Sequence, residues 1–296
     1  MAGRVAIRPD PAFVAAGGPL AAGALTRFAP APTGYLHLGH VANAIVVWGL
    51  ARSTGGRVLL RIEDHDRQRC RPEFETALIE DLAWLGFEAD AGPVRQSDDD
   101  VPYASAVEGL RADGLVYGCD CSRATVRAWA LGAGRSWTGP GCPGGCRDRG
   151  VEGPVWRVAL GGGTETWQDA ALGSRSGDMA TSGGDLPVRD RHGQWTYGLC
   201  VVVDDLRQGI GLVVRGQDLL DATAGQIRLG RLLGRAAPPT FFHHPLIRRP
   251  DGSKLSKSSG DTAVRELRPA GWSAEAVIEA AGSALAAARE SSGRAG

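Results

Sequence analysis

Residues 27–40 read Arg-Phe-Ala-Pro-Ala-Pro-Thr-Gly-Tyr-Leu-His-Leu-Gly-His, and this stretch decides the fold. It predicts a short apolar strand, a turn rich in Pro and Gly, and then the first turn of a helix. A helix N-terminus exposes unpaired N–H groups and the positive end of the helix dipole, so it suits phosphate. His37 and His40 share one helical face beside that site, and Gly39 leaves room for a flat base. Two surface histidines after an ordinary Pro-rich turn are the alternative.

Strands and helices alternate on either side of an irregular middle, which predicts an α/β fold with a parallel sheet. The predicted strands are 25–29, 57–62, 197–203 and 211–215, with a further apolar segment at 241–247, and the predicted helices are 37–51, 72–85, 103–113, 218–233 and 273–289. Between about 117 and 185 the periodicity is lost while Gly, Cys and Trp accumulate, as expected for an inserted small domain. The predicted divisions are an N-terminal extension (1–24), a first catalytic half (25–116), the insertion (117–188), a second catalytic half (189–262) and a helical tail (263–296).

A second chemical signal lies near the end of the chain, in Asp-Gly-Ser-Lys-Leu-Ser-Lys-Ser-Ser-Gly-Asp at 251–261. Lys254 and Lys257 are the only lysines in the sequence, since every other basic residue is Arg. Ammonium groups on flexible stems suit phosphate oxygens, and a Gly-bounded loop can close over a triphosphate. A solvated polar loop is the alternative.

Four cysteines lie within 28 positions, in a C-x-C pair and a C-x3-C pair. Two close pairs of thiolates suit one tetrahedral structural zinc ion, and the candidate ligands are Cys119, Cys121, Cys142 and Cys146. Reduced cysteines in a Gly-rich loop are the alternative. Cys200 lies in an apolar run and is expected in the core.

Composition excludes several other classes of protein. The 43% hydrophobic and 22% charged residues are typical of a globular protein, not of a disordered or fibrous one. A formal net charge of zero argues against a purely nucleic-acid-binding role. No run of 18 apolar residues is present, and Pro and Gly interrupt the uncharged N-terminal stretch, so we expect neither a membrane span nor a signal peptide. A cytoplasmic monomer is expected.

The two loops resemble the paired signatures of class I aminoacyl-tRNA synthetases, here HLGH at 37–40 and KLSKS at 254–258. Longer matches are similar to the glutamyl-tRNA synthetase group: RFAPxPTGxLHLGH, LLRIEDHD at 59–66, YGLCVVVDD at 197–205 and VRGQDLLD at 214–221. The resemblance runs from about Arg27 to Asp261. It implies a Rossmann-type parallel sheet with helices on both faces, interrupted by the zinc-bearing insertion.

The resemblance also implies which residues bind the substrates. Its implied glutamate contacts are Arg27, Phe28, Ala29, Pro30, Ala31, Glu63, Tyr197 and Arg215. Its implied ATP and catalytic residues are His37, Gly39, His40, Lys254 and Lys257, with Mg²⁺ accompanying ATP. Residue chemistry agrees, because guanidinium groups suit the substrate carboxylates and a carboxylate suits its ammonium group. An ion pair between Glu63 and Arg215 is the structural alternative. Ala31 departs from the Ser that is frequent in the family.

The length of the chain and its cysteines indicate which subgroup of the glutamyl-tRNA synthetase group it resembles. The chain ends 38 residues after Ser258, which leaves no room for a separate anticodon-binding domain. This shortened form resembles the glutamyl-queuosine tRNA(Asp) synthetases, whose zinc site has Tyr where this chain has Cys142. They glutamylate queuosine in the anticodon arm of tRNA(Asp). Alternatives are a truncated enzyme that charges tRNA(Glu), a ligase for a small amine, and a catalytically silent RNA-binding module.

Overall fold

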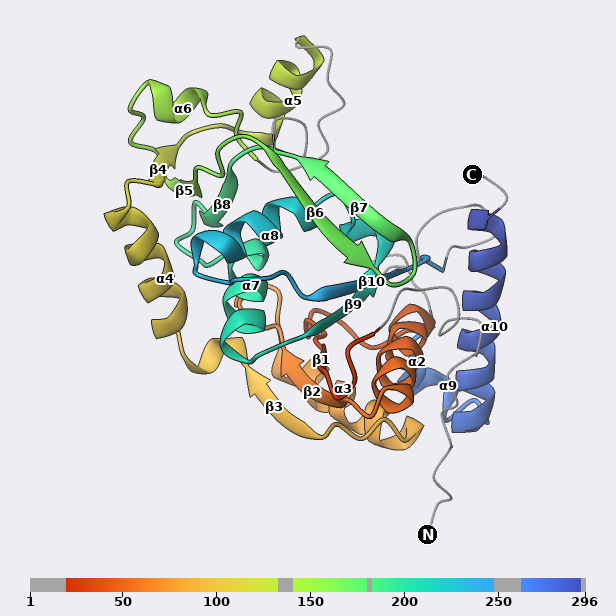
Figure 1. Ribbon diagram of the computed structural model, residues 1–296. Coiled ribbons are helices and arrows are strands. Elements are labelled where there is room, and N and C mark those ends of the chain that lie inside the picture. Colours follow the sequence, from red (N-terminus) through yellow and green to blue (C-terminus); the bar gives the residue numbers. More distant parts are fainter. Residues whose placement is uncertain (1–19, 133–140, 180–182, 248–261, 294–296) are drawn as a thin grey trace.

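The computed structural model describes residues 20–132, 141–179, 183–247 and 262–293 (Figure 1). Its first sheet is parallel, in the order β1-β2-β3 (Leu25–Phe28, Arg57–Ile62 and Ala91–Arg95). β1 lies beside β9 (Leu212–Gly216) of the second sheet, and there the Gly211 N–H donates to the Leu25 carbonyl at 2.9 Å. The two halves of the fold therefore meet at β1 and β9.

The second sheet has the order β7-β6-β10-β9, and its remaining strands are β6 (Thr164–Asp169), β7 (Gly173–Asp178) and β10 (Thr240–His244). β10 pairs in parallel with both β9 and β6, whereas β6 and β7 form an antiparallel hairpin. This hairpin lies within the range predicted for the insertion and yet joins the sheet of the second half. A third, antiparallel sheet has the order β4-β5-β8 (Val116–Cys119, Val155–Val158 and Leu186–Arg189).

Helices cover both faces of the parallel strands (Figure 1). The helices are α2 (Leu38–Ser53), α3 (Pro72–Leu85), α4 (Val101–Ala112), α5 (Arg123–Gly132), α6 (Gly145–Asp148), α7 (Tyr197–Arg207), α8 (Thr223–Leu232), α9 (Val264–Leu267) and α10 (Ala274–Gly293), with 3₁₀ turns η1 (Gln96–Asp98) and η2 (Gln217–Leu219). Among the described residues, none of these helices has the length and apolar character needed to cross a bilayer.

Side chains alternate between two core clusters, as expected for strands buried on both faces. In β2, Leu60 packs in the cluster that includes α2, α3 and α10, whereas Leu59 packs in the cluster that includes α4, α7 and α8. In β9, Val214 and Val213 divide in the same way. The predicted fold class, a parallel α/β sheet with helices on both faces, is confirmed.

The strand predicted at 197–203 is wrong, because these residues open helix α7. Leu199 to Asp205 are all buried, so no polar positions mark a helical period in YGLCVVV. A run of β-branched residues then resembles a buried strand, and only packing distinguishes the two. Here α7 packs against α8 and α4, and burial outweighs the modest β preference of valine.

Asp81 is a buried acidic residue of α3, and its burial makes the stability of the fold depend on pH. Its carboxyl is buried and Oδ2 has no hydrogen-bond partner, and this burial raises its pKa to about 6 despite the attraction of Arg265 and Arg268. Since the unfolded carboxyl ionises near ~3.9, the stability that this site contributes is fully present below that pH and is lost as pH rises towards 6. Asp81→Asn should therefore raise the free energy of unfolding at pH 8 by about 1–3 kcal/mol and leave it unchanged near pH 4.

Urea unfolding at the two pH values measures this difference. Glu279→Gln is the matched control, because Glu279 is an exposed carboxylate in α10 and is not among the charges that shift the pKa of Asp81. An equal gain in the Asp81 variant at both pH values would contradict the assignment.

Candidate functional site

Basic side chains, three arginines and one histidine, project from the carboxyl ends of four parallel strands, where ligands bind in open α/β sheets. Arg61, Arg215 and His243 each follow by two positions a residue of the α4–α7–α8 core cluster, so they point to that same face. Arg27 of β1 shares the face, because its neighbour Phe28 packs on the opposite one. All four side chains are buried. The sheet therefore carries three buried guanidinium groups and one imidazole at its carboxyl edge.

Asp205 of α7 joins the first part of this cluster. It accepts a hydrogen bond from Arg27 Nε at 3.0 Å and another from Arg61 Nη1 at 2.8 Å. Arg61 Nη2 also donates to Glu63 Oε1 at 3.1 Å, just beyond the end of β2. Burial raises the pKa of Asp205, but Arg27 and Arg61 outweigh it and hold that pKa below its usual range. Asp205 and Arg61 thus connect two residues predicted to bind glutamate, Arg27 and Glu63.

Arg215 is held separately. Its Nε donates to His243 Nε2 at 3.0 Å, its Nη1 to Gln226 Oε1 at 2.6 Å, and its Nη2 to Thr223 Oγ1 at 2.7 Å. Glu63 pairs with Arg61, so the alternative of an ion pair between Glu63 and Arg215 is not what the structure forms. Burial lowers the pKa of Arg215.

Tyr197, the first residue of α7, completes the group. Burial raises the pKa of its phenol, the nearby Glu63 carboxylate raises it further, and Arg215 and Arg27 oppose the rise. Three of the predicted glutamate-binding side chains, Glu63, Arg215 and Arg27, therefore lie within electrostatic reach of this phenol. Their contact with glutamate stays a prediction.

The segment from Phe28 to Ala31 is fixed by its surroundings. Phe28 packs against Trp48 of α2, with ring centroids 5.3 Å apart. The Pro30 carbonyl accepts from the Glu63 N–H at 3.1 Å, which ties the turn to the end of β2. Because main-chain atoms form this link, Ala31 in place of Ser leaves it intact.

The two histidines form the N-terminal cap of α2. His37 Nδ1 accepts from the Gly39 N–H, and His40 Nδ1 accepts from the His37 N–H, both at 3.1 Å. The two rings are tilted against each other at 3.9 Å. A Cβ on Gly39 would lie 2.9 Å from His37 Cε1, so glycine permits this arrangement. The predicted role of these three residues beside ATP remains a prediction.

Lys254 and Lys257 lie outside the described residues, but both flanks of their loop are described. Before the loop, His244 Nε2 lies 3.1 Å from Asn43 Oδ1 in α2. After it, the Val264 N–H donates to the Leu36 carbonyl at 2.8 Å, one residue before His37. Both ends of the lysine loop are therefore attached near the histidine motif.

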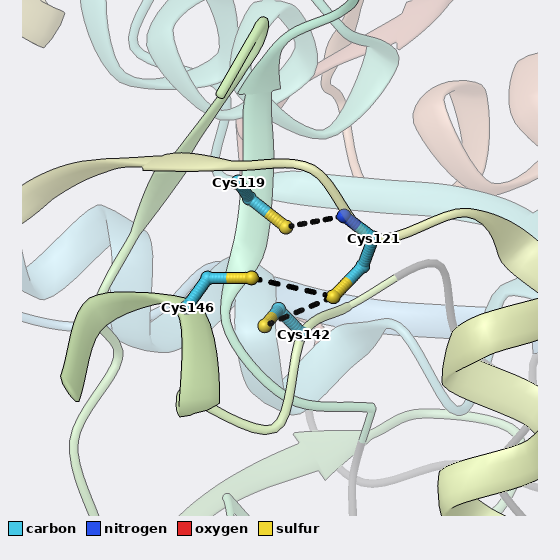
Figure 2. Close-up of side chains that lie close together, drawn as sticks. All are labelled: Cys119, Cys121, Cys142 and Cys146. Atoms are coloured by element: carbon cyan, nitrogen blue, oxygen red, sulfur yellow. Dashed lines mark hydrogen bonds between the residues drawn. The ribbon is translucent and has the colours of Figure 1, made fainter. Parts of the chain in front are cut away.

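The four clustered cysteines form a candidate metal centre in the insertion (Figure 2). Their sulfur atoms all lie within 4.8 Å of one another. Cys121 Sγ lies 3.3 Å from Cys146 Sγ and 4.0 Å from Cys142 Sγ. Tetrahedral zinc with Zn–S bonds of ~2.3 Å separates its sulfurs by ~3.8 Å, so the cluster fits such an ion. The cysteines are free thiols, not disulfides.

The surroundings of the cluster shift the pKa values of its thiols in different directions. Burial raises the pKa of Cys121, and also that of Cys146. For Cys142, burial is outweighed by the backbone N–H groups of Cys146 and Gly144, which lower its pKa. The cluster is held in place by Cys142, which exchanges two backbone hydrogen bonds with Asp185 at 2.8 and 3.2 Å.

Several residues of the strand-end cluster were missed by the sequence analysis. Thr223, Gln226 and His243 lie outside every motif, and Arg61 and Asp205 received no role although they lie within the motifs at 59–66 and 197–205. One signal was available: RVLLRI places an arginine inside a strand that is otherwise buried. A buried guanidinium requires partners, which points to a polar network nearby.

Comparison with known proteins agrees with this geometry. The catalytic domain of tRNA synthetases class I (E and Q) matches residues 24–129 and 179–285, and of the four clustered cysteines only Cys142 and Cys146 lie between the two matched ranges. The glutamyl-Q tRNA(Asp) synthetase of Symbiobacterium thermophilum is 41% identical over 271 residues, covering 85% of this chain and 83% of the relative. The glutamyl-Q tRNA(Asp) synthetase of Rhodobacter capsulatus is 40% identical over 268 residues, covering 84% and 96%.

A solved structure shares the architecture. It is a glutamate tRNA ligase from Elizabethkingia meningosepticum in complex with its amino acid, with a TM-score of 0.67 and 28% identity. The match covers 81% of this chain and 53% of the other, so this chain spans about half of that protein's length.

Proposed function

Because this chain belongs to the class I tRNA synthetases of the E and Q family, and is therefore a ligase, we propose that it activates L-glutamate with ATP and transfers the glutamyl group to queuosine in the anticodon of tRNA(Asp). The observation that carries the proposal is the pair of buried guanidinium groups, Arg27 and Arg215, beside the Glu63 carboxylate at the carboxyl ends of parallel strands. This arrangement complements an amino acid with two carboxylates and one ammonium group.

In the first step, a glutamate α-carboxylate oxygen attacks the α-phosphorus of ATP and pyrophosphate leaves, which forms glutamyl-adenylate. Arg27 and Arg215 hold the carboxylates, and Glu63 holds the ammonium group. His37 and His40, which cap the N-terminus of α2, stabilise the negative charge that develops on the phosphates, and Lys254 and Lys257 share this role. Mg²⁺ enters with ATP as part of the substrate.

In the second step, a hydroxyl of the acceptor nucleoside attacks the glutamyl carbonyl and AMP leaves. The names of the curated relatives support tRNA(Asp) as the acceptor. RNA and ATP both occur in the cytoplasm, where we place the protein. We expect a monomer.

In this proposal the cysteine cluster binds a structural metal ion. Cys119, Cys121, Cys142 and Cys146 would hold one zinc ion in a closed, four-sulfur site, which stabilises the insertion without taking part in the chemistry.

Metal content tests this assignment. Purified protein should contain about one zinc per chain by elemental analysis, and Cys121→Ser should lose it, since a missing thiolate opens the tetrahedral site. Cys70→Ser is the control, because Cys70 lies outside the cluster. Equal zinc in both variants, or no zinc in the wild type, would contradict the four-sulfur site.

Two assays test the proposed function in order. Glutamate-dependent exchange between ATP and pyrophosphate without tRNA distinguishes an enzyme from a silent RNA-binding module. Acylation of queuosine-containing tRNA(Asp), of the same tRNA without queuosine, and of tRNA(Glu) then identifies the acceptor. We expect acylation of the first alone. Preference for tRNA(Glu) would show a truncated tRNA(Glu)-charging enzyme, and exchange without any tRNA acylation would favour a small-amine ligase.

A further inference from the structure

Asp169 and His243 form a buried pair behind Arg215 to which nothing in the proposed mechanism assigns a role. His243 lies in β10, and its side chain is fully buried between Arg215 and Asp169. Asp169 ends β6, a strand within the predicted insertion, and its backbone pairs with Phe241 of β10. Hydrogen bonds therefore connect the Asp169 carboxylate at the end of β6 to the His243 imidazole, and the imidazole to the Arg215 guanidinium.

The hydrogen bonds fix the protonation of this imidazole. Arg215 Nε carries a hydrogen and has no lone pair to offer, so His243 Nε2 can only accept from it. The imidazole proton must then lie on Nδ1, where it is donated to Asp169 Oδ2. Burial lowers the pKa of His243, and the nearby Arg215 charge also disfavours an imidazolium, although the bond to Asp169 opposes this. A neutral ring with its proton on Nδ1 results.

The other carboxylate oxygen of Asp169 is already occupied. Oδ1 accepts from the backbone N–H groups of Ala171 at 3.0 Å, Leu172 at 3.1 Å and His243 at 3.4 Å. An asparagine at this position must keep its oxygen on these three donors. Its NH₂ group would then face His243 Nδ1 and move the ring proton to Nε2, opposite the Arg215 N–H.

We propose that Asp169 is a positioning residue, which acts through the tautomer of His243 to aim Arg215 at the glutamate substrate. This rests on the proposed function, in which Arg215 binds a substrate carboxylate. Residues that orient the ligands of a metal ion typically change affinity by about 10–100-fold when they are mutated, and we expect the same range for a residue that orients Arg215. Because Asp169 ends β6, glutamate binding would also depend on the pairing of the β6–β7 hairpin with β10.

The test combines Asp169→Asn with His243→Gln in pyrophosphate exchange. Asp169→Asn should raise KM for glutamate by ~10–100-fold and leave KM for ATP nearly unchanged. A glutamine amide places its oxygen near the position of Nε2 and has no tautomer to control. Asp169→Asn should therefore add little to KM in the His243→Gln background. His243→Asn should raise KM, because its amide is one carbon shorter and does not reach the Nε2 position that accepts from Arg215.

Two outcomes overturn the inference. One is an unchanged glutamate KM in folded Asp169→Asn, and the other is an equal rise in both backgrounds, which would indicate a purely structural role. Nitrogen-15 NMR of the imidazoles provides a reading that needs no activity: the His243 proton should lie on Nδ1 in the wild type and on Nε2 in Asp169→Asn. A wild-type ring protonated on Nε2 contradicts the inference even if Asp169→Asn fails to fold. Absence of glutamate-dependent exchange in the wild type would instead defeat the proposed function and leave the NMR test valid.

Discussion

Lys257→Ala is expected to lower the rate of glutamate-dependent pyrophosphate exchange by at least ~10²–10³-fold. The ammonium group is expected to stabilise charge that grows on the phosphates as pyrophosphate leaves. The described flanks of the loop contact Leu36 and Asn43, on either side of the histidine motif, so the loop begins and ends close to the α2 N-terminus. Steady-state exchange at saturating ATP and glutamate measures the effect.

Arg57→Ala is the matched control for lost positive charge. Arg57 is exposed at the amino end of β2, the opposite end from Glu63, so its removal should leave exchange near the wild-type rate. Both variants should unfold at the wild-type temperature. Near-normal exchange by folded Lys257→Ala would refute the role of this lysine.

Asp205→Asn is expected to destabilise the protein by about 3–5 kcal/mol. It removes the negative charge that two buried guanidiniums share, and those charges cannot reach water: Arg27 is 4% exposed and Arg61 is fully buried. The same change should raise KM for glutamate, since Arg27 loses the partner that orients it. Urea unfolding and exchange kinetics measure the two effects.

The ion pair between Arg52 and Asp90 is a solvent-exposed control for the buried ion pairs of Asp205. Its atoms are 2.8 Å apart, as close as those of the buried pair, but solvent screens them, so Arg52→Ala should cost less than about 1 kcal/mol. The pH dependence gives a second check. Because the folded pKa of Asp205 is depressed, its contribution is present above the unfolded pKa of ~3.9 and is lost as pH falls through the folded value. A difference between wild type and Asp205→Asn that persists undiminished at pH 2 would contradict this account.

Local sequence was a sound guide wherever one chemical requirement acted on a short segment. The helix predicted at 72–85 begins and ends as predicted, since Pro72 opens it and Gly86 follows it in the left-handed conformation. The turn before His37 and the cysteine pairs were likewise readable, because backbone geometry and sulfur spacing constrain those residue types. The strand predicted at 197–203 failed because burial on all sides removes the periodicity that distinguishes a helix.

The identity of the chemical groups could be predicted from the residues alone: two histidines at a helix start, two lysines in one loop, four thiols, and guanidinium and carboxylate groups at predicted strand ends. Which of these groups contact one another depends on the fold. Asp205 lies 178 positions from Arg27, and His243 lies 74 positions from Asp169. Partners at such separations leave no local pattern, because their contact depends on strand order and on the face to which each side chain points. A guanidinium removed from water is stable only where the fold supplies hydrogen-bond acceptors, so each buried arginine pairs with the acceptors that the fold brings to it.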